Sequence, residues 1–249
     1  MRTALFLPLL CLASPLFAAT FTAPEGCTAN LTVQSRGCSV SHFYTCEKDP
    51  KGNQWRADFG ADGMFYLSMI DSETQWVESY EMNGSGSAPV SKETLDTGAK
   101  DPASFTGLVS TGLDTFDFNL TKNTGEKTHV TGFDQLTGKT ATIDGMTLKQ
   151  TQYEYTQTDD KGTVLRHSKG NEFISEEFRS FFSGTSKWEA ADGTWSTIEG
   201  APVTFIKSGE PGFESTLPLF ECSDQMSALQ PPALPMSPAL PMTPVALRQ

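Results

Sequence analysis

Five cysteines carry the chemistry that is easiest to infer from this sequence. Cys11 lies inside an apolar N-terminal segment, which leaves Cys27, Cys38, Cys46 and Cys222 in the rest of the chain. No two of these four have the two-to-four-residue spacing of a zinc-binding pair. We therefore expect two disulfides and no metal site.

The pairing of the four cysteines can be narrowed by geometry. Residues 38–46 contain neither glycine nor proline and are predicted to form a strand. Eight residues of strand span about 26 Å, which is far beyond disulfide reach, so Cys38 and Cys46 should not pair with each other. Each must then pair with Cys27 or Cys222. A hairpin turn at residues 35–37 would place Cys27 opposite Cys46 and leave Cys38 for Cys222, but the reverse pairing stays open.

The three histidines of the chain, His42, His129 and His167, fall on separate predicted strands. None has a second histidine two or four positions away, so the sequence predicts neither a metal site nor a general base. His42 alternates with Val40 and Tyr44, which indicates a packed histidine.

Carboxylate pairs and serine motifs give no catalytic prediction. Asp114 with Asp117, and Glu176 with Glu177, could do acid–base work, although neighbouring acids in an acidic chain usually form a solvated face. The Gly-x-Ser-x-Gly motif of a nucleophile elbow is absent, since the glycines of residues 83–87 have the wrong spacing. We expect no catalytic residue, no cofactor and no metal ion.

The elements around these residues are predicted to be strands. Threonine and aromatic residues alternate with the period of two that half-buried strands show. Dipeptides and tetrapeptides typical of turns separate the runs. Alternation is clearest in residues 31–34, 64–70, 114–120, 151–156 and 202–206, and the turns are at 49–52, 62–63, 159–162 and 192–193.

These hairpins predict a mainly β protein, an antiparallel meander that forms a curved open sheet, a half-barrel or a barrel. At most one or two short helices are expected. Asp101 and Pro102 predict a helix start, and residues 83–104 are interpreted as a long connection. Residues 172–182 fit either a helical stripe or a strand with a bulge, and we favour the strand. The tryptophans Trp55, Trp76, Trp188 and Trp195 fit sheet packing, with an aromatic binding trough as the alternative.

The two ends of the chain differ from the middle. Residues 1–19 have a positive Arg2, a short apolar run and small residues at Ala18 and Ala19, which is typical of a cleaved secretory signal peptide. Cys11 follows a leucine within that run, so we expect no lipid anchor there. Residues 223–249 are rich in proline and are predicted to be a disordered tail, which leaves one β-rich domain at residues 20–222.

The net charge of −12 excludes some partners. An acidic chain repels phosphate backbones, so nucleic acid is not expected to bind. No stretch is long and apolar enough to span a membrane, and the chain is predicted to be soluble and exported to the periplasm or secreted.

Four segments carry a resemblance to known sequences: residues 32–40, 172–175, 183–185 and 209–213. In these segments the chain is similar to a family of exported proteins of Gram-negative bacteria that has no assigned function. The resemblance implies a periplasmic location and no particular activity.

Three functional hypotheses follow from the sequence. The first is a non-enzymatic periplasmic binding or carrier module for an apolar ligand or an envelope protein, since a curved aromatic sheet forms a natural trough. The second is an enzyme that acts on envelope material through two carboxylates facing each other across a cleft. The third is a structural or interaction protein that uses the proline-rich tail as a contact arm.

Overall fold

The computed structural model describes residues 19–84, 88–190 and 192–222. The predicted proline-rich tail and all but the last residue of the predicted signal peptide lie outside the described residues. The elements, in chain order, are β1 (Cys27–Ser35), β2 (Ser39–Cys46), β3 (Gln54–Gly60), β4 (Gly63–Ile70), β5 (Trp76–Gly84), β6 (Pro89–Leu95), α1 (Phe105–Thr111), β7 (Leu113–Lys122), β8 (Lys127–Ile143), β9 (Met146–Asp159), β10 (Val164–Ser175), β11 (Ser180–Glu189), β12 (Trp195–Glu199) and β13 (Pro202–Lys207).

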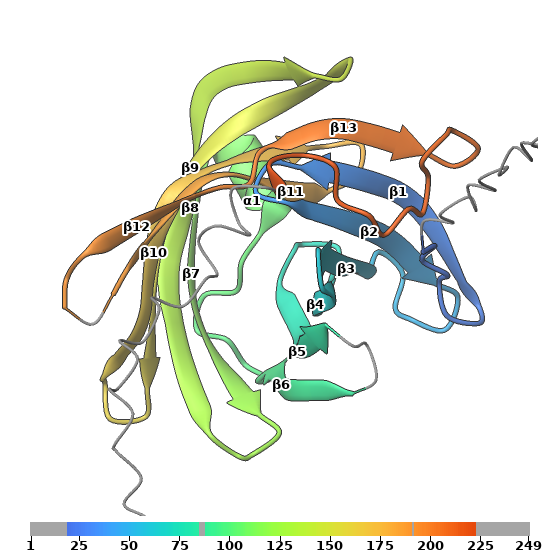
Figure 1. Cartoon of the computed structure of the whole chain (residues 1–249). Helices are drawn as coiled ribbons and strands as arrows, with labels where there is room; N and C mark the ends of the chain where they lie inside the picture. The colour runs from blue at the N-terminus through green and yellow to red at the C-terminus, as the bar shows by residue number, and fades with distance from the viewer. Residues whose placement is uncertain (1–18, 85–87, 191, 223–249) are drawn as a thin grey trace, which may run out of the picture.

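All thirteen strands belong to one antiparallel sheet. From β1 to β12 each strand pairs with the next one along the chain, and β13 returns to pair with β1 at the opposite edge. The predicted mainly β meander is confirmed. Of the three predicted forms, the sheet adopts the curved open one, with β12 and β13 as its edges (Figure 1).

The sheet curls so that side chains from strands near its two ends pack against each other, although no backbone pairing between described residues closes it. Leu31, Val33, Phe43, Leu148, Phe182 and Phe205 form one buried set, which we call the closing cluster. Its members come from β1, β2 and β13 at one end of the sheet and from β9 and β11 towards the other. Phe182 makes edge contacts with Phe43 and Phe205, at ring-centroid distances of 5.6 and 5.1 Å. Packing across strands that are distant in the sheet therefore holds the curl.

The long β8–β9 hairpin also contributes to the curl. It turns at Asp144 and Gly145, both with positive φ, as a tight two-residue turn requires. The Asp144 carboxylate accepts a hydrogen bond from the backbone N–H of Phe205 at 2.9 Å. The tip of this hairpin is thereby attached to β13.

The other face of β1, β2 and β3 has its own core, which includes His42. The imidazole is fully buried, stacks on Phe21 at 4.7 Å and forms a 3.0 Å hydrogen bond with the hydroxyl of Thr32. Burial lowers the pKa of His42 to about 4, so the ring is neutral at pH 7. The prediction that His42 is a packed histidine is confirmed.

The predicted helix start at Asp101 and Pro102 is wrong. The helix begins at Phe105, because the Ser104 side chain caps it by accepting a hydrogen bond from the N–H of Gly107. Asp101 instead forms an isolated backbone bridge with Asp117 on β7.

Two further segments differ from the predictions. Within residues 83–104, the stretch Pro89–Leu95 is not a loop but strand β6, because its backbone pairs with strands on both sides. Residues 172–182 do form strands, but the chain reverses between Ser175 and Ser180, with Arg179 in the left-handed region at φ 45°. The single bulged strand is thus two strands of a hairpin.

Both disulfides form as the hairpin hypothesis arranges them. Cys27 and Cys46 lie directly opposite each other on β1 and β2 and are bonded, and Cys38 is bonded to Cys222. The prediction that Cys38 does not pair with Cys46 is confirmed.

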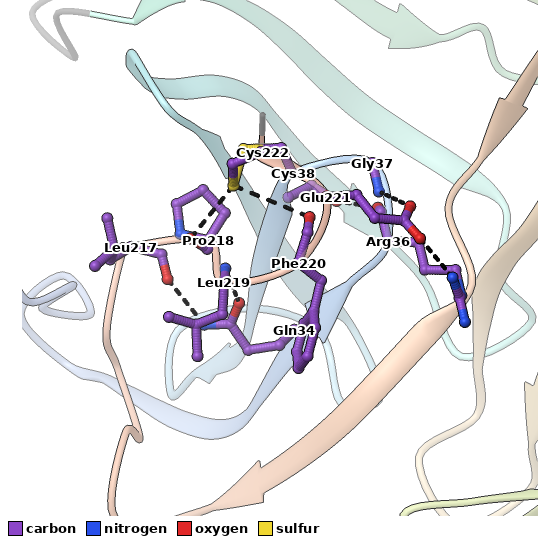
Figure 2. The surroundings of a disulfide bond; sticks show 11 residues. Gln34, Arg36, Gly37, Cys38, Leu217, Pro218, Leu219, Phe220, Glu221 and Cys222 are labelled. Carbon is purple, nitrogen blue, oxygen red and sulfur yellow. Dashed lines mark hydrogen bonds and ion pairs between the residues drawn. A yellow bond between two sulfur atoms is a disulfide. The ribbon is translucent and has the colours of Figure 1, made fainter. Parts of the chain in front are cut away.

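The Cys38–Cys222 bond attaches the last described segment to the β1–β2 turn (Figure 2). The buried Gln34 side chain bonds this segment twice, donating to the carbonyl of Leu217 and accepting from the N–H of Leu219, both at 3.0 Å. The N–H of Cys38 donates to the carbonyl of Phe220 at 2.9 Å. The segment is therefore held by backbone, side-chain and covalent links.

Candidate functional site

The concave face of the curled sheet encloses a cavity of about 880 Å³, which we call the central cavity. Each strand from β2 to β12 contributes to its wall. Its large apolar and aromatic lining residues include Phe43, Tyr66, Trp76, Phe116, Phe118, Tyr153, Tyr155, Leu165, Phe181, Trp188 and Ile198. A second cavity of about 810 Å³ lies beside it and shares several of its lining residues.

The period of two explains why these side chains point inward together. On β7, Phe116 and Phe118 are two residues apart, as are Tyr153 and Tyr155 on β9, so each pair shares one face of the sheet. Gly132 on β8 stands between them. A Cβ at Gly132 would lie 2.8 Å from the Phe116 ring and 2.7 Å from the Tyr155 Cβ, so glycine is needed for the two aromatic side chains to approach.

Large apolar side chains remain accessible in this cavity. Trp76 makes edge contacts with Phe118 at 5.6 Å and with Tyr155 at 5.7 Å, yet 40% of its surface is exposed. Trp188 is 42% exposed. Trp76 and Trp188 therefore fit the aromatic trough that was the alternative interpretation, whereas Trp55 packs against Tyr44 on the other face of β3, as sheet packing predicts.

Several charged groups in the wall have protein partners. Glu78 pairs with Lys92 at 2.6 Å. Arg56 pairs with Asp58 at 3.0 Å, and that carboxylate also accepts a hydrogen bond from the Ser41 hydroxyl at 2.6 Å. The charges of Arg56 and Asp58 therefore balance each other.

Other charged wall groups are partnered in the same way. Glu189 contacts His167 at 2.7 Å behind the wall, and His167 also contacts Glu154 at 2.7 Å. Hydrogen bonds from Glu189 and Glu154 raise the pKa of the imidazole. Arg166 hydrogen-bonds with Tyr155, whose phenol raises the pKa of the guanidinium.

Asp134 on β8 and Glu172 on β10 differ from these wall groups because they lack a directly bonded partner in the described part of the chain. Within residues 19–84, 88–190 and 192–222, neither carboxylate accepts a hydrogen bond or forms an ion pair within 4.0 Å, although both line the cavity. Burial raises the pKa of Glu172 to about 7, and nearby Arg56 opposes that shift. Burial also raises the pKa of Asp134, to which the charges of Glu172 and Asp114 add. Glu93 on β6 also lines the cavity; burial raises its pKa, and the charges of Lys122 and Arg166 oppose that shift. Asp134 and Glu172 are thus the two wall acids of the described residues that share one region of the sheet with Arg56 as the nearby cation.

Replacing Glu172 with glutamine should stabilise the protein at high pH only. The pKa of Glu172 is about 7 in the folded chain against an ordinary 4.5, so stability falls as pH rises between these values. Glutamine removes that loss, and we expect Glu172→Gln to add about 1 to 3 kcal/mol at pH 8 and almost nothing at pH 4. Urea unfolding at both pH values measures it, with Glu176→Gln at an exposed carboxylate as control. An equal difference at both pH values would contradict the prediction.

The residues that the sequence marked as possible acid–base groups are not gathered in the cavity. Asp117 on β7 accepts a hydrogen bond from Lys100 at 2.6 Å and contacts His129 on β8 at 2.7 Å. Asp114 accepts a hydrogen bond from the N–H of Ser104 and thereby supports the start of α1.

Glu176 and Glu177 form ion pairs with Lys149 and Lys207. These contacts are structural, and sequence reasoning missed Asp134 and Glu172 altogether. A signal was present, since each acid follows a strand glycine by two positions, at Gly132 and Gly170. A glycine inside a strand often marks a place where a ligand or another part of the chain approaches closely. The residue two positions later points to that same face of the sheet.

No protein-family model, curated protein or solved structure matches this chain. The resemblance to exported proteins of Gram-negative bacteria accordingly stays a prediction. Among the described residues, no helix is long and apolar enough to cross a membrane. In that same part of the chain, no three histidine, cysteine or acidic side chains gather in a way that could hold a metal ion.

Proposed function

We propose that this chain is an exported binding protein of the periplasm that holds a small apolar ligand in the central cavity. The observation that carries the proposal is the aromatic wall of a cavity of about 880 Å³, a size within the range of ligand pockets. Large apolar side chains such as Trp76 and Trp188 stay accessible there although burial would be favourable. A ligand would cover them.

The periplasmic location is part of this proposal. Two disulfides persist in an oxidising compartment, and they fit the predicted signal peptide at residues 1–19. The tail hypothesis concerns residues 223–249, which lie outside the described part of the chain, so it stays a prediction.

The carboxylates that the sequence suggested for an enzyme are engaged in other contacts. The acids of the two sequence pairs, Asp114 with Asp117 and Glu176 with Glu177, serve the structural contacts described above. Asp134 and Glu172 lie on the same wall of the cavity, on β8 and β10 with only β9 between them, and do not face each other across a cleft. We therefore favour binding over catalysis.

Binding of N-phenyl-1-naphthylamine, a neutral apolar fluorophore, tests the proposal. We expect saturable binding of one probe per chain, weakened about tenfold or more in a Trp76→Ala/Trp188→Ala variant, because the loss of two contact rings exceeds the 1.4 kcal/mol that corresponds to a factor of ten. Fluorescence titration measures the affinity, and native mass spectrometry measures the stoichiometry.

Trp195→Ala is the matched control. Trp195 contacts His167 at 5.0 Å and does not line the cavity, so this variant should bind the probe as the native chain does. Absence of saturable binding, or equal affinity in the double variant and the native chain, would overturn the proposal.

A further inference from the structure

The charges of the central cavity do not balance. Arg56 pairs with Asp58 and Glu78 with Lys92, and Glu189 contacts His167. Arg166 and Glu93, which also line the cavity, attract each other. Asp134 and Glu172 have no such partner in the described part of the chain. Arg56 acts on Glu172 from a distance but is already paired with Asp58. A positive charge brought next to the two carboxylates would therefore gain free energy that a neutral group would not.

The wall also suits a positive charge. The rings of Tyr66, Tyr153 and Tyr155 line the cavity together with the two acids. Aromatic faces attract cations, most strongly where water is excluded. The net charge of −12 further favours the approach of a cation from solution.

An anionic ligand fits the same cavity poorly. The two arginines of the wall already have partners: Arg56 pairs with Asp58, and Arg166 hydrogen-bonds with Tyr155 and is attracted by Glu93. A carboxylate or phosphate would meet the unpartnered Asp134 and Glu172, and like charges in a low-dielectric cavity repel.

We propose that the cavity binds an organic cation, an amphiphile whose apolar body lies on the aromatic wall and whose protonated amine is held by Asp134 and Glu172. This inference rests on the proposed function and narrows its ligand class. The register of β8, β9 and β10 positions the two carboxylates: Asp134 lies opposite Tyr153 on β9, and Glu172 lies opposite Thr151, two residues along the same strand. Arg56 from β3 and Asp114 from β7 are the other charged groups that act on the pair.

Three ligands with one tail and different head groups test this inference. Isothermal titration calorimetry at pH 8 would compare decylammonium, decanol and decanoate with the native chain. We expect decylammonium to bind at least about tenfold more tightly than decanol, and decanoate to bind most weakly, because a single desolvated charge pair corresponds to such a factor.

An Asp134→Asn/Glu172→Gln variant should reduce the preference for decylammonium over decanol to within about twofold, because the amine then meets no carboxylate. This variant removes buried charge and is expected to fold at least as well as the native chain. Glu176→Gln, at an exposed carboxylate, is the control and should keep the native preference.

The pH dependence gives an independent readout. Below pH 7 a proton competes with the amine for Glu172, so decylammonium affinity should fall by about tenfold per pH unit between pH 7 and 5, and decanol affinity should not change. If decanol or decanoate binds as tightly as decylammonium, the inference is wrong and the proposed binding function stands. If none of the three ligands binds, the proposed function itself fails.

Discussion

A variant with alanine at both Cys38 and Cys222 should have a free energy of unfolding about 5 kcal/mol below that of the native chain. The disulfide joins residues separated by 184 positions, and closing so long a loop removes much of the freedom of the unfolded chain. Domains of this kind are stable by about 5–15 kcal/mol, so the variant should be close to unfolding at 37 °C. Urea unfolding of the oxidised proteins measures the difference.

The second disulfide provides the control. Cys27 and Cys46 are separated by only 19 positions, so their double alanine variant should lose about 3 kcal/mol. The two bonds also differ in what they hold. Only loss of the Cys38 bond should increase hydrogen exchange at the N–H of Leu219, which bonds to Gln34. Equal losses from the two variants would show that loop length does not determine the stabilisation.

The strands and disulfides could be predicted because local rules fix them. Alternation of polar and apolar residues identifies a strand, and a turn motif identifies the hairpin that places Cys27 opposite Cys46. The predictions failed where one local rule competed with another. Pro102 fits a first helical position. Ser104 caps the helix instead, because its hydroxyl accepts a hydrogen bond from the N–H of Gly107 and donates one to the Glu73 carboxylate.

The binding cavity could not be predicted because it depends on the curvature of the whole sheet. Alternation indicates which residues share a face, but not whether that face is flat, packed or hollow. Asp134 and Glu172 become neighbours through the pairing of β8 with β9 and of β9 with β10. Each follows a strand glycine by two positions, which Glu176 does not, but that spacing does not show whether the face they share is hollow or packed.

Replacing Phe182 with alanine should lower the free energy of unfolding by about 3–5 kcal/mol, the usual cost of deleting a buried phenylalanine ring. Phe182 is 4% exposed and contacts Phe43 on β2 and Phe205 on β13, so its ring joins the two ends of the sheet. Without it, the closing cluster loses its contact between β11 and β13. Thermal and urea unfolding measure the loss.

The same substitution should weaken ligand binding, although Phe182 does not line the central cavity, because the curvature that encloses the cavity depends on the closing cluster. N-phenyl-1-naphthylamine affinity should therefore fall in Phe182→Ala and recover in Phe182→Leu, which keeps most of the buried volume. Phe65 is 47% exposed, so Phe65→Ala should cost less than about 1 kcal/mol and leave probe binding unchanged. If Phe182→Ala is destabilised but binds the probe normally, the closing cluster stabilises the chain without shaping the cavity, and the curvature must instead come from the strand pairing and the attachment of Asp144 to β13.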